Sequence, residues 1–476
     1  MLSTKKFSVP SHPGFSCTHL KANEQVSADG ATRTPVNFCV LIDTSGSMEM
    51  DRKLHNVCKS LHHLIDYMND SDSISIVTFS DSARIHCKAI AMNSGNKESI
   101  RHILSQLVSN GSTNMSDALI KARECLIPGV TDKKQGILLL TDGHANLGVT
   151  QPSGIVTILE TMVHEFSGCS ISSVGYGSDH NAELLDIMSR KGNGSYAVVN
   201  TIEDVGTVFG TILGDLASCV AQNIKVTFPA GVKLHTKYST EVGADGSVSV
   251  VVGDLSSGCD ATILSEDTGV SVTVSGYDIV NAGAFSSDVD HVDGSGDNMI
   301  GLTTYYRSAV VKLIQEISAV TADNVDDMKN KIRVIRREIK AEKQLSENPI
   351  WDILLEDLSL CKQNLAMPPW MRSVHGQVLT QHGNYLGMMR GTRAVTGGGT
   401  VPLDTQNLFS SPLSRHISGG VSQAVSGDSQ CDAHDTNFNY MTPPRSIAAG
   451  GIATLPPAPM RQPFNGSLSR SVTGMY

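Results

Sequence analysis

Apolar residues follow two alternating spacings between about residues 35 and 200. Six short apolar runs have the length and continuity of strands, namely Asn37–Asp43, Ser73–Phe79, Arg84–Ile90, Gly136–Asp142, Ser170–Gly175 and Ser195–Val199. Between them, apolar residues recur at helical spacing in Leu54–Met68, Lys97–Leu107, Ser116–Leu126, Ile155–Phe166 and Asn181–Ser189. This alternation predicts an α/β fold with a doubly wound, mostly parallel sheet and helices on both of its faces.

The pattern changes after this region. Short β-rich runs separated by turns predict a small antiparallel, sandwich-like domain, and helical spacing returns further along the chain. The last part is rich in Gly, Ser, Thr and Pro, a composition that predicts a largely disordered tail. The predicted organisation is an N-terminal extension (1–34), an α/β domain (35–215), a β-rich domain (216–285), an acidic Gly/Ser linker (286–300), a helical region (301–393) and the tail (394–476).

Net charge, apolar runs and cysteine distribution indicate the class of partner and the compartment of this protein. The formal net charge of −10 leaves no broad basic surface, so nucleic acid is not expected as a partner. No run approaches the roughly 20 apolar residues of a membrane span, and the first residues lack the apolar core of a secretory signal. The ten cysteines are scattered singly, and several lie in apolar runs, which favours buried free thiols. We therefore expect a cytoplasmic protein.

Oxygen-bearing side chains gather at predicted strand ends. Asp43, Ser45 and Ser47 leave the first strand in alternation, Thr113 lies in a loop before a predicted helix, and Asp142 ends the GILLLTD strand. Ligands of open α/β sheets bind at the carboxyl ends of the strands. Three hydroxyls and two carboxylates suit a hard cation, so we expect Mg²⁺, with Mn²⁺ or Ca²⁺ as alternatives. The other interpretation is a turn whose serines merely cap the next helix.

The segments D-x-S-x-S, G-S-T-N and L-L-L-T-D-G resemble the metal-ion-dependent adhesion site of the von Willebrand factor A family. The resemblance implies that Ser45 and Ser47 contact the metal directly and that Thr113 does so when ligand is bound. It implies that Asp43 and Asp142 act chiefly through water. Without an anionic side chain in direct contact, the ion would remain free to attract a carboxylate from another protein.

The order of a β-rich segment, a helical region and Tyr440-Met441-Thr442-Pro443 also looks like an intracellular branch that includes plant RING-type ubiquitin ligases. This sequence departs from that branch because it has no Cys/His zinc framework for a RING finger. Ligase activity is therefore not expected, and a partner in the ubiquitin pathway is kept as an alternative.

Three other groups of residues have the composition of a possible site. Cys58 and His62 have a chelating spacing but fit an ordinary amphipathic helix better. The aspartates between Asp288 and Asp297 do not keep the register of a calcium loop and favour a flexible linker, with a carboxylate donated to the metal site in cis as an alternative. His144 follows Asp142 and suggests either a general base or, as we prefer, an exposed histidine on the binding rim.

Together these residues predict a non-enzymatic, Mg²⁺-dependent adaptor that captures an Asp or Glu of a partner protein. The alternatives are a substrate-binding subunit of a ubiquitin-ligase assembly and a metal-dependent hydrolase. The familiar hydrolase motifs are absent from the sequence, which favours the adaptor.

Overall fold

A computed structural model gives the structure of this chain. It describes residues 2–23, 33–128, 133–166, 168–177, 179–267, 269–292, 298–317, 320, 324–346, 348–367, 369–389 and 408–431. The description of residues 369–375 and 428–431 is limited to the backbone.

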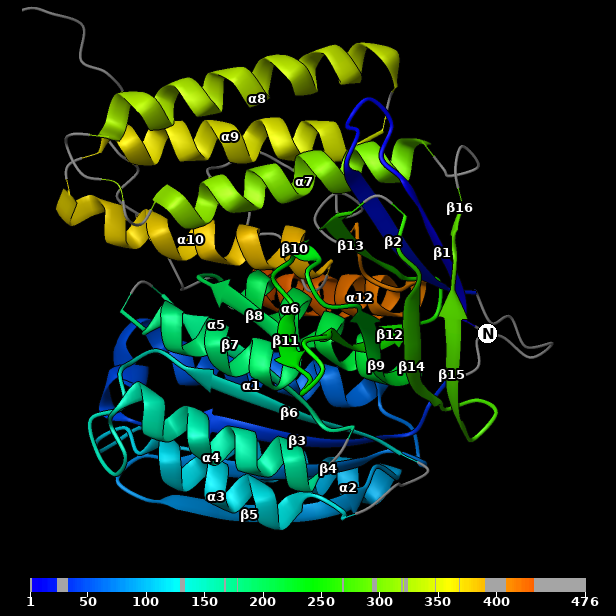
Figure 1. Cartoon of the computed structure of the whole chain (residues 1–476). Coiled ribbons are helices and arrows are strands. Elements are labelled where there is room, and N and C mark those ends of the chain that lie inside the picture. Colours follow the sequence, from blue (N-terminus) through cyan, green and yellow to red (C-terminus); the bar gives the residue numbers. More distant parts are fainter. Residues whose placement is uncertain are drawn as a thin grey trace, which may run out of the picture. The chain divides into compact units, whose positions relative to one another are not determined.

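A six-stranded sheet forms the centre of the first half of the chain (Figure 1). Its order is β5-β4-β3-β6-β7-β8, and only β5 runs antiparallel to its neighbour. The strands are β3 (Val36–Asp43), β4 (Ser73–Phe79), β5 (Ala83–Ala91), β6 (Lys134–Thr141), β7 (Ser170–Tyr176) and β8 (Asn193–Val199). Every residue of β3, β4, β6 and β7 is buried, because both faces of these strands are covered. The predicted α/β class is confirmed.

Helices cover both faces of this sheet. One hydrophobic core joins the sheet to α1 (Lys53–Leu64), α2 (Ser94–Ser105) and α6 (Ile202–Ala217). A second core joins the opposite face to α3 (Met115–Cys125), α4 (Pro152–Glu165) and α5 (Ala182–Lys191). Two short 3-10 helices, η1 (Gly46–Arg52) and η2 (Ile65–Tyr67), flank α1.

A sandwich of two five-stranded sheets lies beside this domain. One sheet has the order β10-β13-β2-β1-β16 and the other β11-β12-β9-β14-β15. The strands outside the N-terminal hairpin are β9 (Cys219–Phe228), β10 (Lys233–His235), β11 (Ser239–Val242), β12 (Val248–Ser256), β13 (Asp260–Glu266), β14 (Val272–Asp278), β15 (Gly283–Val289) and β16 (His291–Val292).

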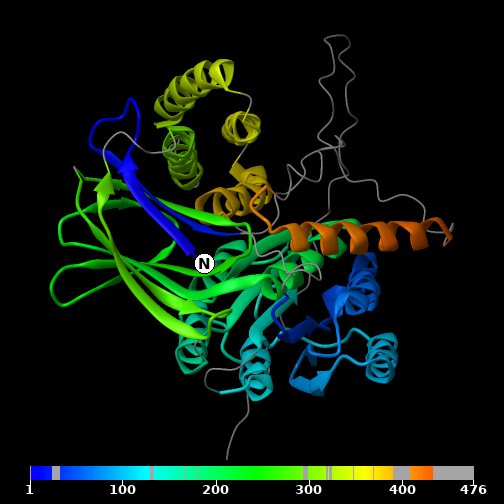
Figure 2. The same cartoon turned by 90° about the vertical axis from the view of Figure 1, so that its right-hand side faces the viewer.

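The prediction of a separate N-terminal extension over 1–34 was wrong. Strands β1 (Leu2–Ser8) and β2 (Phe15–Ala22) form a hairpin inside the sandwich, where β2 pairs with β13 and β1 with β16. Figure 2 shows this blue hairpin beside the green strands. The buried Leu20 and Phe7 tie the hairpin to the rest of the molecule because their apolar surface is removed from water there.

The prediction of an acidic linker over 286–300 is also wrong for most of that range. Residues up to Val292 lie in β15 and β16, and α7 begins at Asn298. Strand β15 lies at the edge of its sheet and is mostly exposed, so its polar residues remain hydrated there. Thr273 Oγ1 donates a hydrogen bond to Asp288 across the strands (2.7 Å), and Ser271 Oγ donates one to Asp290 (2.8 Å).

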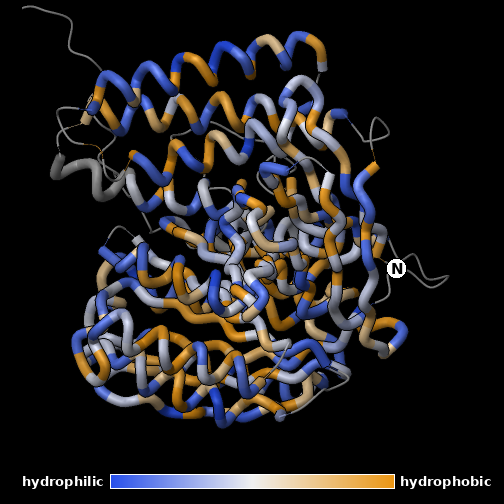
Figure 3. Tube along the Cα trace, viewed as in Figure 1, coloured by the Kyte–Doolittle hydropathy of each residue, from blue (hydrophilic) through white to orange (hydrophobic). Residues whose placement is uncertain are grey.

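Four helices follow, α7 (Asn298–Ile317), α8 (Val325–Leu345), α9 (Ile350–Ala366) and α10 (Pro369–Met388). They share a core that includes Trp351, Leu354 and Tyr385. Figure 3 shows orange, hydrophobic positions along the strands of the six-stranded sheet and frequent blue positions on α8. Only Met328, Ile332 and Ile339 of α8 are buried, as the many charges of that segment suggest.

A last helix, α12 (Pro412–Cys431), lies within the segment that was predicted to be disordered. It packs along α6 and buries Ile417, Val421 and Val425 in the core beneath α1. Glycines recur every fourth residue in α6, and they let the two helix backbones approach closely. A methyl group built on Gly210 would lie 2.5 Å from Ser418 Cα. The prediction of disorder was wrong for residues 412–431, whereas residues 394–407 and 432–476 of the predicted tail lie outside the described residues.

The structure describes the side chains of nine cysteines, and all nine are free thiols. Seven are buried, including Cys39 and Cys169, as the apolar runs around them predicted. Among the described helices, none combines the length and the apolarity needed to cross a membrane.

Candidate metal site

The predicted site lies at the carboxyl ends of two neighbouring strands. Strands β3 and β6 are parallel and in register, with Ile42 opposite Leu140. Strands β4 and β5 follow β3 in the sequence and extend the sheet on one side. Strands β7 and β8 follow β6 and extend the sheet on the other side. The loops after β3 and β6 therefore diverge and leave a crevice at the point where the strand order reverses.

Asp43 is fully buried at the end of β3. Its Oδ1 accepts a hydrogen bond from the backbone N–H of Ser45 (2.8 Å), and its Oδ2 accepts one from Thr141 Oγ1 (2.5 Å). The second bond links the ends of the two strands. The Asp43 carboxylate thus has a fixed orientation, set by neighbours on both loops.

Ser45, Ser47 and Asp142 form a chain of hydrogen bonds. The Ser45 and Ser47 hydroxyls are 3.1 Å apart, and Ser47 Oγ donates to Asp142 Oδ1 at 2.7 Å. Ser45 precedes η1, but its side chain makes no capping hydrogen bond there. The interpretation of Ser45 as a plain helix cap is therefore wrong, and its hydroxyl faces the other site residues instead.

Thr113 is brought to the same place by a third loop. The Gly46 N–H donates to the Gly111 carbonyl (3.0 Å), which ties this loop to the first one. The Thr113 N–H donates to Asn146 Oδ1 (2.8 Å), which ties it to the loop after Asp142. A methyl group built on Gly143 would lie 3.8 Å from both Ser47 Oγ and Thr113 Oγ1. All five predicted residues thus lie around one crevice.

Two residues that the sequence did not single out complete the site. Thr141 holds Asp43, as described above. Lys53, the first residue of α1, donates from Nζ to Asp142 Oδ2 at 2.6 Å, and the two side chains are 10% and 0% exposed. The sequence offered a signal for Thr141, which directly precedes Asp142, but none for Lys53, whose position depends on the path of η1.

The electrostatics of the crevice favour a bound cation. Burial raises the pKa of the Asp43 carboxyl from 3.8 to about 6; hydrogen bonds from Ser45 and Thr141 oppose this rise, and the nearby Asp142 charge adds to it. A buried carboxyl with a raised pKa is one whose charge lacks compensation, and a cation beside it supplies that compensation. Three hydroxyls and two carboxylates, all of them oxygen donors, also match the preference of a hard divalent ion.

The other candidate groups do not form sites in the described part of the chain. No three His, Cys, Asp or Glu side chains gather there as metal ligands would. Cys58 and His62 belong to an amphipathic helix, and Asp288 and Asp290 lie on and just after an edge strand, while Asp293 and Asp297 lie outside the described residues. His144 is exposed in the loop that follows Asp142.

A cavity of about 610 Å³ flanks the crevice between η1, α1 and α2. Its lining begins directly after Ser47, with Met48, Glu49 and Arg52, and continues to Val108 and Ser109 before Thr113. None of the five predicted site residues lines this cavity, but Met48 directly follows Ser47 in the sequence.

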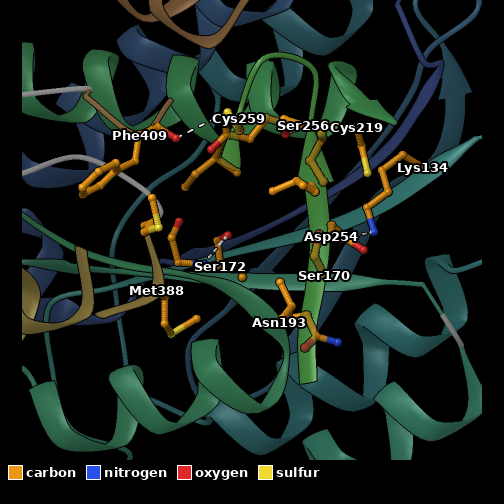
Figure 4. Close-up of a pocket in the computed structure, with 18 of the residues that line it drawn as sticks. Lys134, Ser170, Ser172, Asn193, Cys219, Asp254, Ser256, Cys259, Met388 and Phe409 are labelled. Atoms are coloured by element: carbon orange, nitrogen blue, oxygen red, sulfur yellow. Dashed lines mark hydrogen bonds and ion pairs between the residues drawn. The ribbon is translucent and has the colours of Figure 1, made fainter. Parts of the chain in front are cut away.

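A smaller cavity of about 70 Å³ lies at the opposite edge of the sheet, where β6, β7 and β8 begin, and against the sandwich (Figure 4). Lys134 Nζ lies 2.6 Å from Asp254 Oδ2 at this cavity, and Cys259 Sγ donates to the Phe409 carbonyl (3.5 Å). The volume admits only a few water molecules. This cavity joins two parts of the fold and is separate from the candidate metal site.

Comparison with known proteins identifies the first domain. A family model described as the von Willebrand factor type A domain matches residues 37–211. YfbK, an uncharacterized protein of Escherichia coli (strain K12), is 28% identical over 243 residues, which cover 49% of this chain and 41% of that protein. Inter-alpha-trypsin inhibitor heavy chain H3 of Mesocricetus auratus is 24% identical over 269 residues, which cover 55% of this chain and 29% of that protein. The chain thus spans less than half the length of these relatives.

Solved structures share the fold over more of the chain. A von Willebrand factor type A protein from Catenulispora acidiphila superposes with a TM-score of 0.58 at 14% identity, covering 83% of this chain and 97% of its own. The ArnB paralog VWA2 from Sulfolobus acidocaldarius gives 0.50 at 15% identity, covering 81% and 98%. The ubiquitin-ligase branch and the cytoplasmic location stay predictions. The sheet, the crevice at its reversal point and the family match together show that residues 37–211 are a von Willebrand factor type A domain.

Proposed function

We propose that this protein is a non-enzymatic binding protein whose crevice holds Mg²⁺ and presents it to an Asp or Glu side chain of a partner protein. Mn²⁺ and Ca²⁺ are the alternative ions for the same oxygen donors. Ser45, Ser47 and Thr113 would hold the ion, and Asp43 and Asp142 would act on it mainly through water.

The observation that carries the proposal is that the loops that supply the site residues also expose large apolar side chains, which we call the apolar rim. Large hydrophobic side chains are exposed on each of the three loops that supply the site residues: Met50 (59%), Val108 (72%), Leu147 (40%) and Val149 (39%). Exposed apolar groups clustered around a polar centre are typical of a surface that another protein covers. A site for a free metal ion or a small anion has no need of them.

The hydrogen bonds explain why such an ion would attract a carboxylate. Each oxygen of Asp43 and Asp142 already accepts a hydrogen bond from this chain. A hydroxyl that donates its hydrogen, as Ser47 does to Asp142, keeps its oxygen lone pairs for a metal ion, and this oxygen is neutral. An ion held mainly by neutral oxygens retains most of its charge for an anionic ligand.

Metal binding is tested by titrating Mg²⁺ and Mn²⁺ into the wild-type protein and the Ser45→Ala and Ser47→Ala variants by calorimetry. We expect each variant to lose roughly tenfold or more in metal affinity, because each removes an oxygen donor. Ser71→Ala, which changes an exposed serine in the loop before β4, is the matched control and should bind like the wild type. Equal affinity in all four proteins would refute the site.

The partner surface is tested separately with Val108→Asp, which places a charge on the rim without removing a metal donor. We expect this variant to bind Mg²⁺ normally and to lose partners that the wild-type protein retains in Mg²⁺ and releases in EDTA. Mass spectrometry of the eluates compares the sets. Partners that survive both EDTA and Val108→Asp would contradict a metal-centred interface.

A further inference from the structure

Lys53 brings a positive charge into the candidate metal site. Its ammonium group lies 2.6 Å from Asp142 Oδ2, while Asp142 Oδ1 accepts the Ser47 hydroxyl. The Lys53 side chain is 10% exposed and that of Asp142 is fully buried, so water screens the pair weakly. One carboxylate of the site is therefore shared between a serine that would hold the ion and a cation of the chain itself.

The backbone before Lys53 is shaped to place it there. Asp51 and Arg52 both have positive φ (57° and 54°), and neither is glycine. Two consecutive left-handed residues break η1 from α1, so that α1 begins at Lys53 beside the crevice. Side-chain-bearing residues adopt this conformation only where the surroundings hold them, and such strain gathers at functional sites.

Other buried lysines of this chain have a different setting. Lys6 pairs with Asp267, and Lys134 pairs with Asp254. Those two carboxylates belong to the sandwich, away from the crevice, and the pairs hold strands together. Among the buried lysines that the structure describes, Lys53 alone pairs with a predicted residue of the metal site. A purely structural role explains the other pairs but leaves the position of Lys53 unexplained.

We propose that Lys53 partly neutralises the negative charge of Asp142 in the metal site. The bound ion then keeps its attraction for the partner's carboxylate. This inference rests on the proposed function. A positive charge beside a divalent cation weakens metal binding by repulsion, and it strengthens the binding of an anion by attraction. Removing the charge should therefore change the two affinities in opposite directions.

The test uses Lys53→Gln, which keeps a donor for Asp142 but loses the charge, and Lys53→Met, which keeps only the aliphatic stem. Mn²⁺ alone is titrated into the full chain by calorimetry. We expect both variants to bind Mn²⁺ roughly tenfold more tightly than the wild type, and Lys53→Arg to bind as the wild type does. Thermal denaturation in EDTA reports whether each variant is folded.

Lys59→Met is the control for net charge, because it removes the same charge from the same helix six residues further along. It should leave Mn²⁺ affinity unchanged. Loss of a merely structural lysine weakens a binding site, so tighter binding is a readout that a structural role does not produce. Unchanged or weaker Mn²⁺ binding in a folded Lys53→Gln or Lys53→Met protein overturns the inference. Equal Mn²⁺ binding by the wild type and Ser45→Ala overturns the proposed function itself.

Discussion

Single hydrogen bonds between distant residues hold the candidate site in shape. Thr141 reaches Asp43 across the two central strands, and Asp142 accepts bonds from both Ser47 and Lys53. These contacts fix the carboxylates before any ligand arrives. Preorganised donors of this kind bind with less loss of conformational freedom.

A buried histidine near the site makes the stability of the domain depend on pH. His180 is 4% exposed, its Nε2 lies 2.7 Å from the Tyr196 hydroxyl, and burial lowers its pKa from 6.5 to about 4. Below pH 6.5 the unfolded chain takes up a proton that the folded chain does not. The free energy of unfolding is therefore highest above pH 6.5. It falls as pH decreases toward 4, by on the order of 3 kcal/mol at most.

We accordingly expect the melting temperature of the wild-type protein in EDTA to fall more steeply between pH 6.5 and 4.5 than that of His180→Gln. The exposed His144→Gln serves as the control and should follow the wild-type curve. Melting curves at five pH values suffice for this comparison. Parallel wild-type and His180→Gln curves would show that His180 is protonated equally in both states.

The proximity of the two candidate aspartates could be predicted from the sequence because both lie at strand ends. Asp43 and Asp142 each follow a continuous apolar run, and neighbouring parallel strands bring such positions together. Lys53 could not be found in this way. Its approach to Asp142 depends on the positive φ of Asp51 and Arg52. Asp adopts positive φ more often than most residues, but the sequence does not require that conformation at either position.

At the scale of elements, the contact between α6 and α12 governs how one face of the sheet is closed. Gly206, Gly210 and Gly214 lie against α12, and Ile417, Val421 and Val425 enter the core from it. In Figure 2, α12 is the orange helix at residues 412–431. Close approach of the backbones lets a helix with few large side chains pack tightly.

Replacing Gly210 tests this contact. A Cβ there would lie 2.5 Å from Ser418 Cα, a backbone atom that cannot give way without moving the helix. We expect Gly210→Val to loosen α12, lower the melting temperature by several degrees and speed hydrogen exchange across residues 412–431. Gly427→Ala is the control, since nothing lies within 4 Å of its Cβ. Protection of α12 that is the same in both variants would contradict the close packing.

The sequence predicted the strands and most helices of the first domain, but it missed α12. Its composition, PLSRHISGGVSQAVSGDSQC, is rich in Ser and Gly, which are poor helix formers in isolation. Tertiary contact overrides that preference, because small residues fit the glycines of α6. The spacing of Ile417, Val421 and Val425 at every fourth residue was the available signal.

At the scale of the whole molecule, a buried ion pair connects the von Willebrand factor type A domain to the sandwich. Lys134 begins β6 and is 1% exposed, and its partner Asp254 belongs to β12 (Figure 4). The two regions therefore share a charge pair within their contact. A buried charge that loses its partner is strongly destabilising.

We expect Asp254→Asn to lower the free energy of unfolding by on the order of 3 kcal/mol, because Lys134 is left buried without its counter-charge. The double variant Lys134→Met with Asp254→Leu removes both charges and should recover most of the loss. Urea denaturation followed by circular dichroism compares the three proteins. A double variant as unstable as the single one would mean that packing, and not charge, controls this contact.

The sandwich itself was predicted only in part. The β-rich segment from 216 to 285 gave a clear signal, whereas β1 and β2 gave a weak one. Lys6 is fully buried within β1 through its pair with Asp267. A lysine at an inward position disrupts the apolar alternation that marks a strand. The partner strand that explains it is distant in the sequence.

The N-terminal hairpin also constrains the order in which the molecule is made. A ribosome releases β1 and β2 before β13, the neighbour of β2, which emerges about 240 residues later. At 5–20 residues per second the hairpin waits roughly 10 to 50 s, with Phe7 and Leu20 uncovered. Residues 37–211 are made during that delay, so the loops of the candidate site can come together before the sandwich closes.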